Sequence, residues 1–315
     1  MNLTDLLAQH QTTPANSVPD WVIGAFKRRS ISFANGLTDI QTHVFWLQSR
    51  NLTVDLRLPI DAEQVTEKVL QDFSTDDIRA LANYEGWSAD SVWLNDQLSW
   101  SGGTSLQLHN RWPEPAELKR IGDCMVEFAP SGAYVEDWRL LSRSSGPLLG
   151  LKLLEETDAT TGEVRHRDGA LIINGDWAGL VLGRPTPLTS DTPQPLRELL
   201  DSNGSDDLLQ QAIFQFETSI AQGNLDDGFR IKYSTLPQRV NQTLFQLDGF
   251  EVDSDNKTVL HRFHDKDREI IRRFSIDTIE NHFGFSPMTR QTSPSKDWFD
   301  REQETLNRYL CPVQT

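Results

Sequence analysis

The chain has 315 residues, of which 37% are hydrophobic and 24% are charged, and this composition is typical of a globular rather than a disordered protein. Its formal net charge of −16 opposes binding to phosphate backbones and to anionic membrane surfaces, so neither nucleic acid nor membrane is an expected partner. The sequence has two cysteines, Cys124 and Cys311, and begins without the basic and apolar regions of a signal peptide. These features predict a cytoplasmic protein in which both thiols are unpaired.

In chain order, the first half predicts a short helix over residues 3–10, a loose polar linker, and then many short strands separated by turn residues. Two further helices are expected at 61–72, where Asp61 and Gln64 have the spacing of a capping box, and at 74–83. Strands are expected at 30–34, 43–48, 52–57, 83–87, 91–94, 98–100, 105–112, 123–128 and 133–141.

The second half is organised around residues 169–185, where two apolar strands flank a turn through Asn174, Gly175 and Asp176. Asn-Gly between β-branched residues is the strongest short-range signal for a hairpin. Further strands are expected at 148–156, 213–220, 228–234, 243–252, 259–264 and 269–276, with helices at 193–201 and 295–309.

The fold class expected from this pattern is all-β with a few short helices, arranged as two antiparallel β-barrels. The stretch 142–147 (SRSSGP) has the composition of a linker. The expected organisation is therefore an N-terminal extension at 1–20, a first barrel at 21–146, and a second barrel with a C-terminal helix at 147–315.

The order of strands resembles a known family. The segments Phe45-Trp46-Leu47, 52–57, Tyr134–Trp138 and, most closely, 179–184 (GLVLGR) are similar to the fungal Hri ("Hri-one") proteins, with weaker similarity through 214–251. The resemblance covers most of residues 25–252 and implies two lipocalin-like β-barrel domains. It implies no catalytic residues, and residues 253–315 exceed what it accounts for.

Alternation in the strand at 134–141 places Glu136 and Trp138 on one face. If that face lines a barrel, a carboxylate beside tryptophan has a raised pKa and serves as an acid or as a ligand anchor. The alternative is that this face is the outer one, or that Glu136 pairs with a buried arginine such as Arg57.

Arg57 and Arg184 each end a predicted strand, where an arginine at a barrel mouth binds a ligand carboxylate or forms an ion pair at the surface. Trp46 and Trp93, together with Trp87 and Trp100, either line an apolar pocket or form plain core. These arguments select Trp46, Arg57, Trp93, Glu136, Trp138 and Arg184 as candidate ligand-binding residues.

The sequence has no P-loop, dinucleotide fingerprint, Gly-x-Ser-x-Gly, HExxH or CxxC motif. His261 and His264 point to opposite faces of a strand, so no metal site and no cofactor are expected. The favoured hypothesis is a protein that binds a small apolar or amphipathic ligand, or a protein partner, without turnover. Two alternatives stay open: a lipocalin-like hydratase, isomerase or cyclase acting in a tryptophan-lined lumen, and a scaffolding protein with filled barrels.

Overall fold

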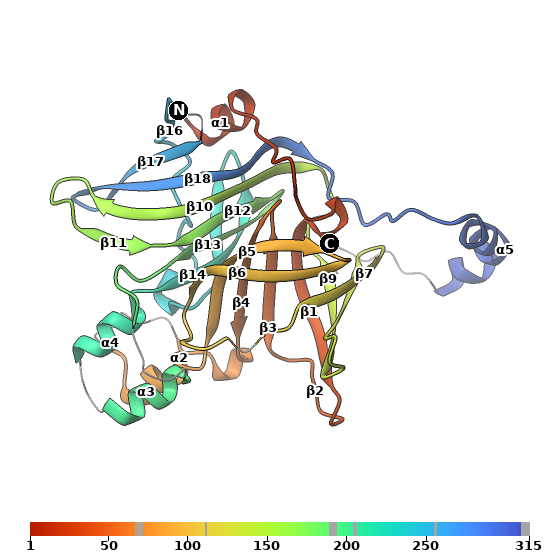
Figure 1. Cartoon of the computed structure of the whole chain (residues 1–315), viewed down its shortest axis with the longest axis horizontal. Coiled ribbons are helices and arrows are strands. Elements are labelled where there is room, and N and C mark those ends of the chain that lie inside the picture. The colour runs from red at the N-terminus through yellow and green to blue at the C-terminus, as the bar shows by residue number, and fades with distance from the viewer. Residues whose placement is uncertain are drawn as a thin grey trace.

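The computed structural model describes residues 1–66, 68, 72–110, 112–188, 194–203, 207–254 and 257–309. Among them the chain forms eighteen strands in two sheets, and five α-helices (Figure 1). The first sheet holds β1 (Gly24–Phe33), β2 (Thr38–Asp39), β3 (His43–Gln48), β4 (Leu52–Leu58), β5 (Glu85–Leu94), β6 (Gln97–Ser105), β7 (Ala116–Ile121), β8 (Cys124–Phe128) and β9 (Tyr134–Leu140). The second holds β10 (Gly146–Asp158), β11 (Val164–Arg167), β12 (Gly169–Asn174), β13 (Trp177–Leu182), β14 (Glu217–Asn224), β15 (Gly228–Ser234), β16 (Phe250–Val252), β17 (Thr258–Asp265) and β18 (Arg268–Phe283). The helices are α1 (Leu3–Gln9), α2 (Thr75–Leu81), α3 (Leu196–Asn203), α4 (Asp207–Phe214) and α5 (Ser293–Tyr309).

The first sheet closes into an antiparallel barrel. Its strands follow the order β1-β3-β4-β5-β6-β7-β8-β9, and β9 pairs back to β1 from Phe26↔Leu140 to Phe33↔Tyr134. The short β2 pairs with the far end of β1 and lies outside the ring. The antiparallel barrel predicted for the first half is therefore confirmed.

The second sheet is open. Its order is β15-β14-β13-β12-β10-β18-β17-β16, with β11 paired to β10, and no ladder among the described residues joins β15 to β16. Instead, the stretch before β16 crosses β15 through the bridge Arg230↔Thr243. The sequence predicted a second closed barrel, and on this point the prediction is wrong. Residues 243–249, expected to be strand, form bends and isolated bridges that do not complete the ring.

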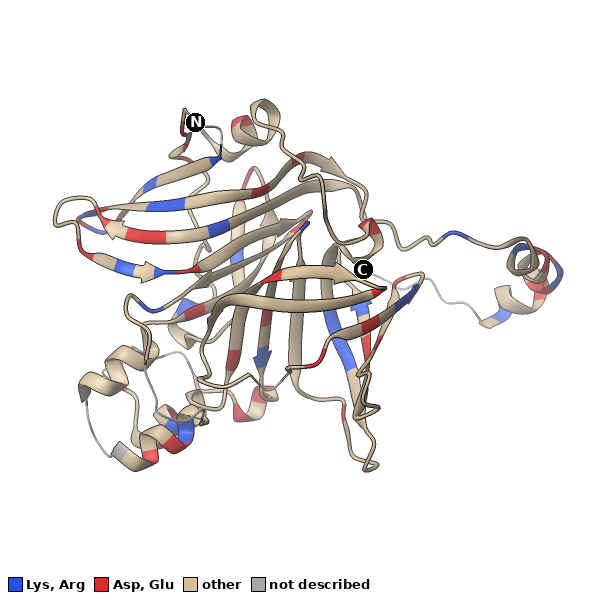
Figure 2. Ribbon diagram, viewed as in Figure 1, with Lys and Arg blue, Asp and Glu red and all other residues tan. Residues whose placement is uncertain are grey.

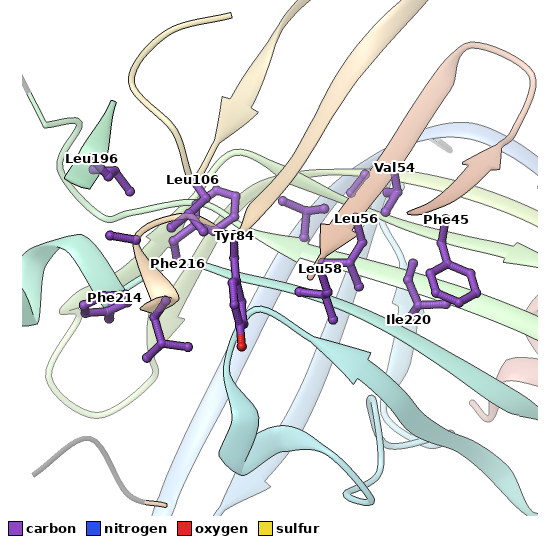
Figure 3. Close-up of a cluster of buried hydrophobic side chains, with 14 of the residues drawn as sticks. Phe45, Val54, Leu56, Leu58, Tyr84, Leu106, Leu196, Phe214, Phe216 and Ile220 are labelled. Atoms are coloured by element: carbon purple, nitrogen blue, oxygen red, sulfur yellow. The ribbon is translucent and has the colours of Figure 1, made fainter. Parts of the chain in front are cut away.

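The two sheets share one apolar core. In β4, Leu52, Val54 and Leu56 point out of the barrel and pack against residues of β12 to β14 such as Val181 and Ile220 (Figure 3). Since a barrel wall ordinarily faces solvent, this contact explains why every residue of β4 is buried. Helices α2, α3 and α4 contribute buried residues to the same core and gather at one end of it (Figure 1).

Glycines let the sheets approach closely. A Cβ at Gly86 of β5 would lie 2.5 Å from the hydroxyl oxygen of Thr218 in β14. A Cβ at Gly179 of β13 would lie 3.1 Å from side-chain carbons of Leu47 and Val54. The hairpin at the centre of the sequence pattern is thus the part of the second sheet that lies against the barrel.

Each end of the chain packs against the opposite half of the molecule. Leu3, Leu6 and Leu7 of α1 are buried against the second sheet, and Thr12 pairs with Ile279 of β18. In return, the end of β18 brings Phe283 into the apolar cluster inside the first barrel. The 1–20 segment, expected to be a short helix and a loose polar linker, therefore packs on the second sheet from α1 to Thr12, while Val18 joins the apolar cluster of the first barrel.

Two other elements differ from the sequence prediction, each for a local reason. The helix expected at 61–72 is reduced to a single 3-10 turn at Asp61–Glu63 among its described residues, and the capping box lies instead at Ser74 and Asp77, which open α2. The strand expected at 213–220 is divided between the end of α4 and the start of β14. An apolar run of this length does not distinguish helix from strand by its periodicity alone.

Cys124, at the start of β8, is a free thiol, and its Sγ lies 3.5 Å from a carboxylate oxygen of Asp137. Cys311 lies outside the described residues. Among the described residues, no helix combines the length and the hydropathy that crossing a bilayer requires.

Replacing Trp138 with alanine is expected to lower the free energy of unfolding by about 3–5 kcal/mol, as for other buried aromatic truncations. Trp138 is 1% exposed, and its ring packs edge-on against Trp46 with the centroids 5.5 Å apart. Urea denaturation followed by circular dichroism measures the change. Trp298→Ala on the exposed α5 is the control, and a midpoint shift no larger than that of the control contradicts the prediction.

Candidate functional site

The interior of the first barrel is polar at one end. Because side chains alternate along a strand, the outward leucines of β4 leave Thr53, Asp55 and Arg57 facing inward, and all three are buried. On the other side of the barrel, β9 turns Glu136 and Trp138 inward, and both are 1% exposed. The alternation predicted for both strands is confirmed.

Arg57 is the centre of this polar end. Its Nε donates to Asp55 Oδ1 at 2.9 Å, and its Nη1 lies 3.9 Å from Glu136 Oε1. The guanidinium stacks on the ring of Trp112, 4.1 Å from the centroid. Burial opposes the charge, but attraction to Asp55 and Glu136 outweighs burial and raises the pKa of Arg57. Its Nη1 is buried without a hydrogen-bond partner among the described residues.

Glu136 makes its main ion pair with an arginine that the sequence reasoning did not select. Arg28 of β1 donates from Nη1 to Glu136 Oε1 at 2.8 Å, and its Nη2 bonds Asp39. Both residues of the Arg28–Glu136 pair are almost fully buried. Glu136 therefore lies between two arginines, Arg28 and Arg57.

Glu127 of β8 lies directly across from Glu136 in the ladder. Burial, together with repulsion from Glu136, raises the pKa of Glu127 well above its ordinary value. Its carboxyl group accepts hydrogen bonds from Trp138 Nε1 at 3.1 Å and from the Tyr134 hydroxyl at 3.4 Å. Two buried carboxyl groups thus face each other across this ladder, and the raised pKa belongs to Glu127.

The barrel interior has little free space beside this network. The cavity bounded by Trp46, Arg57, Glu127 and Trp138 has a volume of about 10 Å³. This is room for about one water molecule. Side chains therefore fill the barrel centre.

A larger pocket opens through the barrel wall beside the filled centre. It has a volume of about 290 Å³ and lies between the β5–β6 hairpin and residues 107–112. The wall is interrupted here because β6 pairs with β7 only at Gln97↔Glu117 and Leu98↔Ala116. This pocket, called the side pocket below, is lined by Glu85, Trp87, Ser88, Ala89, Trp100, Ser101, Gly102, Gly103, Thr104, Ser105, Gln107, Leu108, His109, Asn110 and Trp112.

Three tryptophans join the side pocket to the barrel interior. Trp87, Trp100 and Trp112 line both spaces, and the rings of Trp87 and Trp100 meet edge to face. Gly103 shapes the outer wall, since its φ is +79° and a Cβ there would lie 1.9 Å from the carbonyl oxygen of Ser88. The pocket thus offers apolar ring faces on one side and hydroxyl, amide and backbone groups on the other.

Of the six residues selected from the sequence, the structure brings four together: Trp46, Arg57, Glu136 and Trp138 lie in the barrel interior. The ring of Trp93 packs edge-on against Trp21, 5.6 Å between centroids, and joins the edge of the apolar cluster that holds Trp46 and Trp138. Arg184 lies between the sheets.

The guanidinium of Arg184 donates to the carbonyl oxygens of Ser105, Leu106 and Ile213 at 2.8–3.0 Å. Burial lowers the pKa of Arg184 to about 10. Its donors join the end of β6 in the first half to α4 in the second half, and among the described residues no hydrogen bond or ion pair links it to the barrel network.

The comparisons with known proteins give no relatives: no family model, curated protein or solved structure matches this chain. Within the described parts of the chain, no group of three or more His, Cys, Asp or Glu side chains has the arrangement of a metal site.

Proposed function

We propose that the protein binds a small amphipathic ligand in the side pocket, without turnover. The observation that carries this proposal is the exposure of Trp87, Trp100 and Trp112 to one pocket of about 290 Å³. That volume is at the lower end of the range for small-molecule sites, which are typically apolar with a few polar groups that fix orientation. A ligand with a flat apolar face would stack on the rings, and its polar edge would meet Ser101, Thr104 and Asn110.

The charged network behind the pocket supports the proposal by keeping the wall rigid. Arg57 stacks on the inner face of Trp112, while Trp112 Nε1 donates to Glu85 Oε2 at 3.3 Å. A ring held on two sides loses little freedom when a ligand stacks on it, which favours affinity. The lipocalin-like character, the two-domain organisation with a boundary at 142–147, the cytoplasmic location and the resemblance to the fungal Hri proteins stay parts of this proposal.

Native mass spectrometry of protein purified from its own host tests the proposal, with a co-purified small molecule as the expected result. Ser101→Trp, which fills the pocket from an exposed position, should abolish the added mass without removing a core contact. Trp298→Leu on the exposed α5 is the matched control and should retain it. Retention of the ligand by Ser101→Trp would place the site elsewhere and contradict the proposal.

A second candidate function is acid catalysis. The raised pKa of Glu127 favours it, because a general acid must carry its proton near neutral pH. Under this alternative Glu127→Gln retains the ligand but loses its conversion. The barrel centre, with a cavity of about 10 Å³, favours the remaining alternative, a scaffolding protein with a filled barrel. Under that alternative we expect no bound ligand in the parent protein or in any variant.

A further inference from the structure

A second pocket lies in the other half of the molecule, at one end of the open sheet. Its volume is about 520 Å³, and it is bounded by β10, β11, the ends of β17 and β18, and residues 238–246. Basic and acidic residues both lie along β10 and β18, and the charged residues of β11 are arginines (Figure 2). This pocket, called the sheet-end pocket below, shares no lining residue with the side pocket.

Arg272 of β18 is the most deeply placed cation of the sheet-end pocket. It is 6% exposed, its Nε donates to Glu156 Oε2 at 2.7 Å, and its guanidinium stacks on Phe263, 4.7 Å from the centroid. Neither Nη atom has a hydrogen-bond partner among the described residues. Since the buried polar atoms that lack a partner do not include these two Nη atoms, both are reached from the cavity, where they offer two donors to an acceptor in the pocket.

Arg239 is the fully occupied arginine of the pocket. It donates from Nε to Glu217 at 3.0 Å, from Nη1 to Gln242 and from Nη2 to the carbonyl oxygen of Leu244. Arg165 donates one hydrogen bond, to Asp265 at 3.1 Å, and lies 3.5 Å from Glu156. Among the described residues the free guanidinium donors of the pocket therefore belong to Arg272 and Arg165, of which Arg272 is the more deeply buried.

The charge balance of the pocket is positive. Four cations (Arg165, Arg239, Lys266 and Arg272) line it with three carboxylates (Glu156, Glu217 and Asp265). Burial opposes ionisation of Glu156, but Arg272 and its other neighbours outweigh burial and lower the pKa of that carboxyl. The lining therefore has one more cation than it has carboxylates, which favours an anionic ligand over a neutral or cationic one.

We propose that the sheet-end pocket binds a small molecule through one carboxylate or phosphate group, with Arg272 as the anchor and Arg165 and Lys266 beside it. A guanidinium offers two parallel donors to either kind of oxyanion, so both chemistries fit the same anchor. Phe263 and Leu244 cover the remaining wall and suit the apolar body of an organic anion. This site is independent of the side pocket and of the function proposed for it.

Isothermal titration calorimetry with inorganic phosphate and, separately, with succinate tests the proposal at low ionic strength. Saturable one-to-one binding of at least one probe is expected, and the probe that binds more tightly identifies the chemistry of the group. No binding of either probe overturns the proposal.

The site is located by variants. Arg272→Gln alone leaves Glu156 buried without its partner, so the double variant Glu156→Gln/Arg272→Gln is used to remove both charges together. It should weaken binding at least tenfold. Lys266→Asn should weaken binding several-fold while tolerating the positive φ of +58° at that turn.

Two variants serve as controls. Lys296→Asn removes a cation from the exposed α5, and Ser101→Trp fills the side pocket; both should bind the probe as the parent does. Equal affinity of the double variant and the parent overturns the proposal. Loss of binding in Ser101→Trp also overturns it, because it would place the probe in the side pocket.

Discussion

Replacing Arg57 with methionine is expected to lower the free energy of unfolding by about 3–5 kcal/mol, the usual result of removing one partner from a buried ion pair. Asp55 is 3% exposed and has no other arginine in contact, so the variant leaves its carboxylate buried without a counter-charge. Methionine fills much of the same volume, so the loss reports charge rather than a cavity. Urea denaturation at neutral pH measures it.

The double variant Asp55→Asn/Arg57→Met should recover part of this stability, because it removes both members of the pair. Arg79→Met breaks the exposed pair with Asp201 and should cost no more than about 1 kcal/mol. If Arg57→Met costs as little as Arg79→Met, the barrel network does not depend on the Arg57 charge.

Acid is expected to destabilise the protein through His261, on β17. Its ring lies between Phe250 and Phe263, with centroids 4.2 and 5.0 Å away, and Nε2 faces the carbonyl oxygens of Gln246 and Asp248. Burial, with repulsion from Arg272, lowers the pKa of His261 from 6.5 to about 3. Below pH ~6.5 the unfolded chain therefore binds a proton that the folded chain does not, and stability falls by about 1.4 kcal/mol per pH unit for this group.

The comparison of parent and His261→Gln isolates this effect from other titrating groups. Glutamine donates a hydrogen bond to the same carbonyls but does not titrate. The stability advantage of the parent over His261→Gln should shrink by about 2–3 kcal/mol between about pH 6.5 and pH 4.5. His282→Gln, at an exposed position, should show a constant difference. A constant difference for His261→Gln as well would mean that His261 takes up its proton in the folded state.

Local patterns in the sequence predicted much of the fold. Asn-Gly and alternating apolar residues located the 169–182 hairpin and the paired strands β3 and β4, and the change from one sheet to the other falls at 141–145, close to the expected boundary. Local patterns could not show that the apolar face of β4 would point outward. Alternation says which residues share a face, and only the second sheet decides which face is the inner one.

Strand alternation also explains why only part of the candidate site was predicted from the sequence. Alternation in β9 puts Glu136 on the same face as Trp138, and Trp138 was expected to face the barrel interior. Arg57 was the buried arginine expected to pair with Glu136, so the three residues were selected together. Arg28 and Glu127 were missed although each shares a strand face with a buried apolar residue of the barrel core, Arg28 with Phe26 and Glu127 with Met125. Charged residues in amphipathic strands ordinarily mark the side that faces solvent. This barrel has charged residues on its inner side, so the rule assigns them to the wrong face.

The contact between Thr12 and β18 can form only after β18 has been synthesised. Thr278 Oγ1 donates to the carbonyl oxygen of Thr12 across 266 residues of sequence. At about 5–20 residues per second, a ribosome takes roughly 10–50 s to make that intervening chain. Throughout that interval Leu3, Leu6 and Leu7 have no β18 to cover them. Until β18 emerges, the apolar face of the N-terminal helix therefore lacks this cover, and a translational pause shortly before β18 would lengthen its exposure.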